Sequence, residues 1–377
     1  MNTYKITIRP VDTFYFGSEK KFNPADTTES NYLVESLKVP QQTSVLGMLR
    51  FALLKRMIKT TNSYQNKEKD LIGENSFDAK SLKYGVIEKL SPVFIEKNGD
   101  LYVESGLNYQ RYQNKDTKDL YPVQLELTSI TGIAKTSVDK SNIVYFFSNY
   151  DPKQNLAHYL TIKGAHNTPV SNIIPYDYII KECQQPGNRK DRTGKTNLEG
   201  YYKQTKFRME EGFSYCVYIQ SPENLLDGDF FATLGGDQSL FKIEIKKEKD
   251  SNIFPGNPEA KSQKGIVKLI SHAFLNTLNN TYFSFLETTD FRYLRTKYGE
   301  TDSERYASIY TLRDQTWDKT NNQYNPQSLK IPKMSKPIRL VSKGSVFYCE
   351  DVESFVKHLN NTAYQAIGYN YYEIIYQ

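Results

Sequence analysis

The chain has few of the features that mark membrane, disulfide-bonded and zinc proteins. No stretch approaches the about 20 consecutive apolar residues of a membrane-spanning helix, so we expect no membrane segment. The three cysteines, Cys183, Cys216 and Cys349, lie far apart without the spacing of a metal site. This pattern argues against zinc and suits a reducing cytoplasm. The first residues enter a strand pattern directly, so we expect no signal peptide.

The common motifs of nucleotide and acyl chemistry are also missing. The sequence has no P-loop, no dinucleotide-binding glycine motif and no nucleophile elbow. Gly235-Gly236-Asp237 resembles the metal-binding turn of nucleotide cyclases, but Gln238 and Ser239 follow where a second acid is needed. We therefore expect a tight turn between two strands at this point, with no metal or cofactor.

Aromatic side chains are what the chain has in excess. Its 377 residues include 30 tyrosines, 20 phenylalanines and one tryptophan, and its formal net charge is +6. Aromatic rings among scattered lysines and arginines suit a surface that stacks bases and neutralises phosphates. An AT-rich genome explains the same composition, because it enriches tyrosine, asparagine and lysine everywhere. The length allows two domains, but composition leaves both explanations open.

The N-terminal region predicts a strand, a long loop and a helix. Residues 3–9 alternate between apolar and polar side chains, which indicates a strand with one apolar face that ends at Pro10. A polar, irregular segment follows. Pro40 excludes a helix before it, and an almost unbroken apolar run from 45 to 54 predicts a buried helix. This order opens a ferredoxin-like β-α-β unit.

The start of that helix has the residues of an anion site. Thr43 and Ser44 are good N-cap residues, Gly47 leaves a gap without a side chain, and Arg50 lies one turn further on the same face. Together they could hold a phosphate. The alternative is structural: Gly47 only lets another element pack closely, and Arg50 is solvated.

A basic, glycine-flanked segment follows in the middle of the chain. Residues 189–195 contain four basic residues, and an alternating strand begins at Lys203. We interpret residues 184–202 as an extended loop or hairpin that projects from a sheet and contacts nucleic acid. An ordinary solvated loop explains the same composition, and this alternative stays open.

The second half repeats the pattern of the first without repeating its sequence. Residues 213–219 and 234–245 predict strands, 265–278 a helix with one apolar face, and 352–359 a short helix before a last strand. We therefore expect an α+β fold of two ferredoxin-like (RRM-type, βαββαβ) domains with long loop insertions. The N-terminal domain covers residues 1–212 and the C-terminal domain residues 213–377.

Histidines are the candidates for metal-free RNA cleavage. Such a ribonuclease needs a histidine or tyrosine base and a cationic partner near the phosphate. His158 and His166 lie eight residues apart in a strand–loop region. Nothing in the sequence marks either one as a base, and surface or structural histidines explain both.

Four sequence islands resemble one protein family. They are residues 6–17, with Ile6-Thr7-Ile8-Arg9-Pro10 and Phe14-Tyr15-Phe16-Gly17; Pro40-Gln41-Gln42-Thr43-Ser44-Val45-Leu46-Gly47-Met48-Leu49-Arg50; Arg189-Lys190-Asp191-Arg192-Thr193-Gly194 with Gly200-Tyr201-Tyr202; and Gly344-Ser345-Val346-Phe347-Tyr348 with Ile367-Gly368-Tyr369. In this order they resemble the third Cmr subunit of type III-B CRISPR effector complexes, a member of the RAMP superfamily.

The resemblance implies a non-catalytic, RNA-binding subunit of an antiviral ribonucleoprotein complex. Such a subunit holds the 5′ handle of the guide RNA and contacts the large polymerase/cyclase-type subunit and the first backbone RAMP subunit. Its tail carries a Gly-aromatic-Gly loop, which is Gly368-Tyr369-Asn370 here, and asparagine tolerates the left-handed backbone of such a turn. The implied RNA-binding residues are Arg9, Lys20, Lys21, Gln41, Gln42, Thr43, Ser44, Gly47, Arg50, Asn188, Arg189, Lys190, Arg192, Thr193, Lys195, Tyr201, Tyr202, Gly368 and Tyr369.

Two alternatives remain at this level. One is a RAMP endoribonuclease that cuts the guide precursor, with His158 or His166 in its site. The other is the equivalent handle-binding subunit of a type III-A or related complex.

Overall fold

The computed structural model describes most of the chain. The described residues are 1–21, 33–60, 67–73, 77, 84–113, 116, 120–131, 143–153, 158–164, 173–190, 196–222, 228–249, 254–291, 294–295, 317–318, 323–324, 333–334 and 337–376. Side chains are not described at 18–21, 33–35, 55–60, 67–69, 120, 131, 187–190, 196–203 and in the short strands between 294 and 334.

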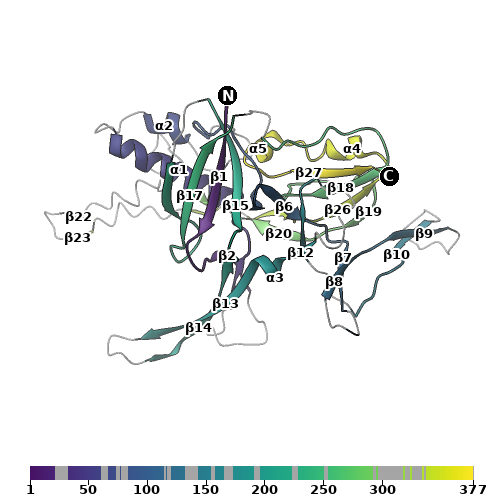
Figure 1. Cartoon of the computed structure of the whole chain (residues 1–377), viewed down its shortest axis with the longest axis horizontal. Coiled ribbons are helices and arrows are strands. Elements are labelled where there is room, and N and C mark those ends of the chain that lie inside the picture. The colour runs from purple at the N-terminus through teal and green to yellow at the C-terminus, as the bar shows by residue number, and fades with distance from the viewer. Residues whose placement is uncertain are drawn as a thin grey trace.

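A nine-stranded sheet has the most strands of the described sheets, and we refer to it and the helices packed on it as the first body (Figure 1). Its order is β12-β11-β6-β5-β15-β1-β17-β16, and β4 pairs with β15. The strands are β1 (Asn2–Pro10), β4 (Lys89–Leu90), β5 (Phe94–Lys97), β6 (Asp100–Glu104), β11 (Tyr159–Ile162), β12 (Ile174–Pro175), β15 (Ser214–Ser221), β16 (Gly228–Thr233) and β17 (Leu240–Lys247). The predicted alternation of β1 is confirmed, because Tyr4, Ile6 and Ile8 are buried on one face.

Helix α1 (Gln42–Thr60) packs on that buried face. Val45, Leu46 and Leu49 join Ile6 and Ile8 in one hydrophobic core, which confirms the predicted buried helix. A short helix, α2 (Lys67–Ile72), lies beside α1 (Figure 1). No helix within the described ranges is long and apolar enough to span a membrane.

Strand β1 pairs with two strands that come much later in the sequence. Ile6 lies opposite Val217 of β15 on one side and opposite Ile245 of β17 on the other, and both pairings are antiparallel. A division of the chain at residue 212 would therefore separate β1 from both of its partners.

A four-stranded antiparallel sheet forms the second body, with the order β19-β26-β18-β27. Its strands are β18 (Gly265–Leu269), β19 (Thr281–Phe285), β26 (Val346–Cys349) and β27 (Tyr372–Tyr376), and its helices are α4 (Val352–Val356) and α5 (Thr362–Gln365). The predicted short helix at 352–359 is confirmed at its start. The prediction of a helix over 265–278 is wrong, because Gly265–Leu269 form the strand β18. Val267 and Leu269, two residues apart, are buried on the same face, as expected for a strand.

A long hairpin projects from the first body (Figure 1). It consists of β13 (Ile180–Lys190) and β14 (Thr196–Met209), and it continues a sheet with β3 (Leu33–Leu37) and β2 (Phe16–Lys21). β14 runs parallel to β3 and antiparallel to β13. The projecting hairpin predicted for residues 184–202 is therefore confirmed.

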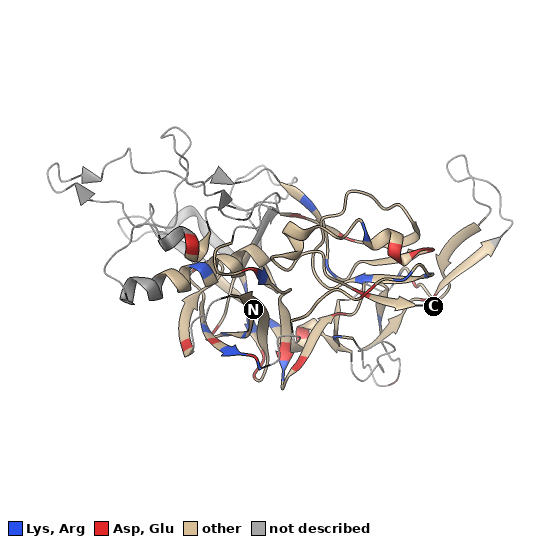
Figure 2. Cartoon of the chain, turned by 90° about the horizontal axis from the view of Figure 1, so that it is seen from above, with Lys and Arg blue, Asp and Glu red and all other residues tan. Residues whose placement is uncertain are grey.

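A second arm consists of two further hairpins. They are β7 (Tyr109–Gln113) with β8 (Leu120–Gln124), and β9 (Leu127–Thr131) with β10 (Ile143–Phe147). The strands of the β9–β10 hairpin carry no charged side chain (Figure 2). The remaining elements are α3 (Tyr176–Ile179) and the pairs β20 (Thr288–Phe291) with β25 (Ile338–Val341), β21 (Leu294–Arg295) with β24 (Lys333–Met334), and β22 (Trp317–Asp318) with β23 (Gln323–Tyr324).

Candidate functional site

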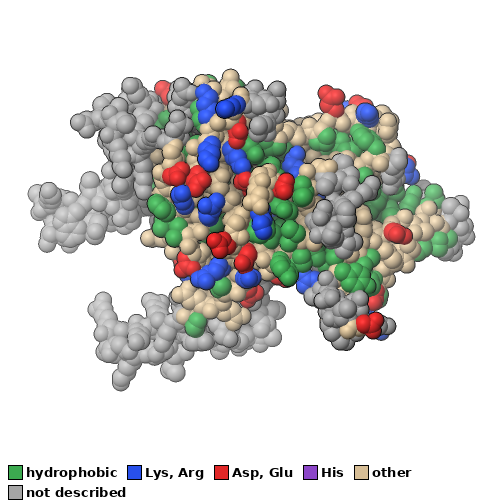
Figure 3. Space-filling model, viewed as in Figure 1, with side chains coloured by type: hydrophobic (Ala, Val, Ile, Leu, Met, Phe, Trp, Pro, Cys, Tyr) green, Lys and Arg blue, Asp and Glu red, His purple; other side chains and the backbone are tan. Residues whose placement is uncertain are grey.

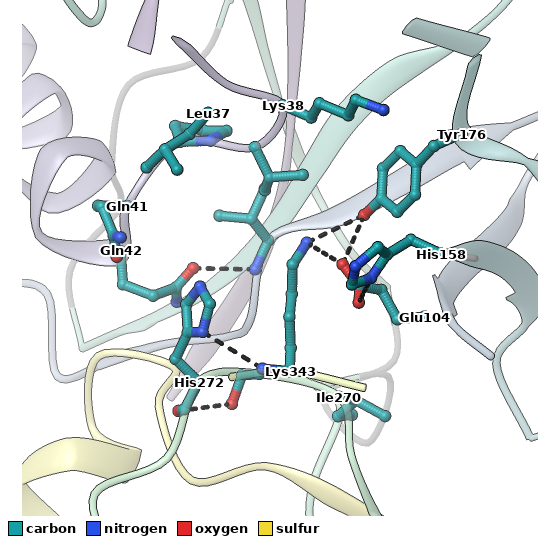
Figure 4. Close-up of a pocket in the computed structure, with 14 residues that line it drawn as sticks. Leu37, Lys38, Gln41, Gln42, Glu104, His158, Tyr176, Ile270, His272 and Lys343 are labelled. Atoms are coloured by element: carbon teal, nitrogen blue, oxygen red, sulfur yellow. Dashed lines mark hydrogen bonds and ion pairs between the residues drawn. The ribbon is translucent and has the colours of Figure 1, made fainter. Parts of the chain in front are cut away.

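A cavity of about 230 Å³ lies where the two bodies meet (Figure 4). Its wall is formed by the segment that precedes α1, the end of β6, α3 and two loops of the second body. The lining residues are Leu37, Lys38, Val39, Pro40, Gln41, Gln42, Val93, Glu104, His158, Tyr176, Ile270, Ser271, His272 and Lys343. We refer to this space as the junction cavity.

Glu104, the last residue of β6, organises the charges at one end of the junction cavity. Its Oε1 lies 3.0 Å from Nζ of Lys343 and accepts a 3.0 Å hydrogen bond from the Tyr176 hydroxyl. Its Oε2 lies 3.5 Å from Nδ1 of His158. Burial by itself would raise the pKa of Glu104, but Lys343 and His158 outweigh it and lower this pKa to about 2.

The two histidines of the cavity have opposite pKa shifts. The hydrogen bond to Glu104 raises the pKa of His158, against the effect of burial. Burial, assisted by the charge of Lys343, lowers the pKa of His272 to about 4. Nδ1 of His272 accepts a 3.2 Å hydrogen bond from the backbone N–H of Lys343. His272 is therefore neutral at pH 7, with its proton on Nε2.

Tyr176 lies between two lysines. The Nζ atoms of Lys38 and Lys343 lie 5.4 Å and 5.6 Å from the centroid of its ring. Lys38 also forms a 2.8 Å ion pair with Asp177, the next residue of α3. Burial and the nearby Glu104 carboxylate raise the pKa of the Tyr176 hydroxyl well above its usual value, so this group donates rather than ionises.

Gln42 connects the start of α1 to both bodies. Its Nε2 donates to the carbonyl oxygens of Ser91 and Ile367 at 2.8 Å and 2.7 Å, and its Oε1 accepts from the backbone N–H of Val93 at 3.0 Å. The side chain is 5% exposed, and all of these partners belong to the protein. These bonds hold the Gln42 side chain between the two bodies, and the RNA contact that the resemblance implies for it stays a prediction.

The tail loop is buried in this chain, and the RNA contacts that the resemblance implies for Gly368 and Tyr369 stay predictions. Tyr369 is 0% exposed, and its hydroxyl donates to Oε1 of Gln41 at 3.3 Å. Gly368 has φ +89°, and a Cβ there would collide with Gln42 and with the backbone of Ser91. Asn370 has φ +60°, which confirms the left-handed turn expected at this position.

The start of α1 differs from the predicted N-cap position, and anion binding there stays a prediction. The helix begins at Gln42, so Thr43 and Ser44 lie inside its first turn and not at its N-cap. Arg50 is 7% exposed, and its guanidinium lies 5.5 Å from the ring centroid of Tyr84. No described atom outside the helix backbone lies within 4 Å of a Cβ placed on Gly47.

Arg9 lies on the open face of the large sheet, where charges pair with one another. It lies 3.8 Å from Glu244 of β17, and Lys5 forms a 2.7 Å ion pair with Glu96. Figure 3 shows basic and acidic side chains interleaved on this face. For some of the other predicted residues the structure describes only the backbone: Lys20, Lys21, Asn188, Arg189, Lys190, Tyr201 and Tyr202. Others lie outside the described residues altogether: Arg192, Thr193, Lys195 and the candidate base His166.

Sequence reasoning singled out His158 but missed its partner Glu104, the Tyr176 and Lys343 side chains that contact Glu104, and also His272. The tail motif contained one residue, Gly344, that pointed to this charged cluster. Gly344, next to Lys343, has φ +82°, and a Cβ there would lie 2.8 Å from Oε2 of Glu104. This glycine makes room for the carboxylate, but its role depends on a residue distant in the sequence.

The Gly235-Gly236-Asp237 segment is the one place where the sequence resembles a metal-binding turn. Gly235 and Asp237 both have positive φ between β16 and β17, which confirms the predicted tight turn. In the described part of the chain, no group of three or more histidine, cysteine or carboxylate side chains is arranged to hold a metal ion.

Three comparisons relate the chain to known proteins. No curated protein matches it. Among solved structures it is similar to a chain in the cryo-EM structure of the Type III-B Cmr-beta bound to cognate target RNA, with 13% identity, a TM-score of 0.48 and coverage of 97% of this chain and 95% of that chain. It is also similar to a chain of the Type III-B Cmr-beta apo state, with 11% identity, a TM-score of 0.29 and coverage of 66% and 98%.

The comparison with protein families is the informative one. The model of the family described as CRISPR-associated protein (Cas_Cmr3) matches residues 6–375. The match spans nearly the whole chain, so the resemblance to the third Cmr subunit of type III-B complexes is confirmed, and the chain belongs to the Cas_Cmr3 family of CRISPR-associated proteins.

Proposed function

We propose that this protein is a non-catalytic, RNA-binding subunit of a type III-B CRISPR effector complex. It holds the 5′ handle of the guide RNA and contacts the large polymerase/cyclase-type subunit and a backbone RAMP subunit in the cytoplasm. Family membership supports the place in the complex. The observation that carries RNA binding is the projecting β13–β14 hairpin, whose sequence has four basic residues within 189–195.

The strand orders support two ferredoxin-like halves. In the first body, β17-β1-β15-β5 is an antiparallel run in which the strands follow the ferredoxin order 4-1-3-2, and α1 connects the first two. In the second, β27-β18-β26-β19 has the same order, and α4 and α5 precede the last strand. These orders favour a boundary after β17 over one at residue 212.

RNA binding is tested with the full chain by fluorescence anisotropy. The probes are the handle RNA and a scrambled RNA of equal length, each at two salt concentrations. We expect preference for the handle, and weaker binding after Arg189→Ala/Arg192→Ala with a salt slope lower by about 1.4, because each lost phosphate contact to a single strand removes about 0.7. The matched control is Arg339→Ala/Lys357→Ala, which removes two exposed cations elsewhere. Equal binding of both RNAs that is indifferent to the hairpin variant would contradict the proposal.

The endoribonuclease alternative has one observation in its favour. His158, a possible base, lines the junction cavity together with Lys343, a cation. Its Nδ1, however, faces Glu104. Incubation of the full chain with repeat RNA in the absence of metal decides: cleavage that is lost in His158→Ala would establish this alternative and overturn the non-catalytic role.

A further inference from the structure

The junction cavity is a slot with mostly apolar walls. Leu37, Val39, Pro40, Val93 and Ile270 supply the apolar side chains, and the nine other lining residues are polar or ionisable. Small-molecule sites typically have this composition, with apolar walls that bury a ring and a few polar groups that orient it. The small volume of the cavity suits a single ring system rather than a longer ligand.

The cations around the slot are already neutralised by protein carboxylates. Glu104 lies within 3.5 Å of both Lys343 and His158, and Asp177 lies 2.8 Å from Lys38. A phosphate in the slot would have to compete with Glu104, whose pKa is so low that it stays ionised at any physiological pH. The charges therefore favour an uncharged group inside the slot.

One hydrogen-bond donor in the slot is left without a protein partner. Because Nδ1 of His272 accepts from the backbone of Lys343, Nε2 carries the proton. Nε2 has no hydrogen-bond partner among the residues that the structure describes. His272 is partly exposed, and a ligand that covers its Nε2–H must present an acceptor, because a donor buried without one loses free energy.

We propose that the junction cavity receives one unpaired nucleobase of the bound RNA, with an acceptor atom on the base edge hydrogen-bonded to Nε2–H of His272. The apolar walls cover the faces of the base, and the sugar and phosphates stay outside. The inference rests on the proposed RNA-binding function and assigns it a base-reading site that is distinct from the phosphate-binding hairpin. Single-stranded RNA is commonly recognised through bases splayed out in this way.

The experiment uses the full chain and short single-stranded RNAs that each carry 2-aminopurine at one position. The 2-aminopurine fluorescence reports how its ring is stacked, and the anisotropy of an end label on the same RNA reports total binding. We expect at least one position to change its fluorescence on binding. In His272→Phe the response at that position requires about three- to tenfold more protein, the equivalent of one neutral hydrogen bond. Val39→Phe, which fills the slot, should abolish the response while the end label still reports binding.

The matched control is His358→Phe, an equal change at an exposed histidine beyond α4, and it should leave the response unchanged. A fluorescence change that is equal in wild type, His272→Phe and Val39→Phe would overturn the inference. The same holds if no position responds although the RNA binds.

A second measurement separates failure of this inference from failure of the proposed function. Adenosine, guanosine, cytidine, uridine and ribose 5-phosphate are each titrated against the full chain and followed by ligand-observed NMR. If no RNA binds but a nucleoside does, and His272→Phe weakens it, the slot is a nucleobase site and the guide-RNA function fails. If ribose 5-phosphate binds and no nucleoside does, the slot is an anion site and the inference is wrong.

Discussion

Two glycines that look alike in the sequence have opposite roles. Gly368 has φ +89°, and a Cβ there would overlap Nε2 of Gln42 and the backbone of Ser91. Gly47 lies inside α1, and among the described atoms outside the helix backbone none would come within 4 Å of a Cβ placed there. We expect Gly368→Ala to lower the free energy of unfolding by at least about 2 kcal/mol, from backbone strain and overpacking.

Urea denaturation measures this prediction, and Gly47→Ala is its control. That change should be neutral or stabilise by about 1 kcal/mol, because alanine is the better helix former. Equal effects of the two substitutions would contradict the assignment of Gly368 as the residue that lets the tail loop close on α1.

At His272 the structure predicts a pH dependence. Burial and Lys343 lower its folded-state pKa to about 4, from 6.5 in the unfolded chain, and Glu104 partly opposes this shift. Between these values the unfolded chain binds more protons, so stability rises with pH across the window and is lost as pH falls from 6.5 to 4. The loss attributable to His272 amounts to as much as about 3 kcal/mol.

Urea denaturation of wild type and His272→Phe at a series of pH values tests this. The variant should show a flatter dependence between pH 4 and 6.5. His158, whose pKa is raised, contributes stability at low pH that is lost as pH rises through its folded pKa, and it is present in both proteins. Parallel pH profiles would mean that His272 is not held neutral by the fold.

At the scale of elements, the β13–β14 hairpin extends beyond the body that supports it. Gln185 pairs with Gln204 near the point where β14 also contacts β3. We expect that replacing residues 186–203 with an Asn-Gly turn leaves the thermal unfolding midpoint nearly unchanged, because the deleted part lies beyond this contact. RNA affinity in the anisotropy assay should fall, since the four basic residues are removed.

The sequence predicted this hairpin but misassigned β18, and the difference has a physical cause. The hairpin is marked by local chemistry, with glycines and charges between alternating strands. Residues 265–274 fit a helical period as well as a strand period, because apolar residues occupy both sets of positions. Pairing with β26 and β27 on both sides satisfies the backbone of β18 and selects the strand.

At the scale of the whole molecule, the ion pair between Glu104 and Lys343 joins the two bodies. Glu104 ends β6 of the large sheet, and Lys343 precedes β26 of the second sheet. We expect Lys343→Met to lower the free energy of unfolding by about 3–5 kcal/mol, because it leaves a buried carboxylate without its main cation.

The double variant Glu104→Gln/Lys343→Met should recover a large part of this loss, as it removes the unpaired charge. Lys357→Met, which breaks an exposed ion pair with Glu353, is the control and should cost no more than about 0.5 kcal/mol. Urea denaturation compares the three. A loss in Lys343→Met no larger than in Lys357→Met would show that the bridge does not hold the bodies together.

The sequence by itself determined the elements whose signals are local and the family to which the chain belongs. The alternation of β1, the apolar run of α1 and the projecting hairpin are all encoded within a few neighbouring residues. Tertiary structure alone decided that β1 lies between β15 and β17, that the Gln42 side chain bonds to the backbone of Ile367, and that Glu104, His158, Tyr176, His272 and Lys343 surround one cavity. These relations depend on contacts between residues far apart in the chain, and no pattern in a local window specifies which distant partner will fill the space.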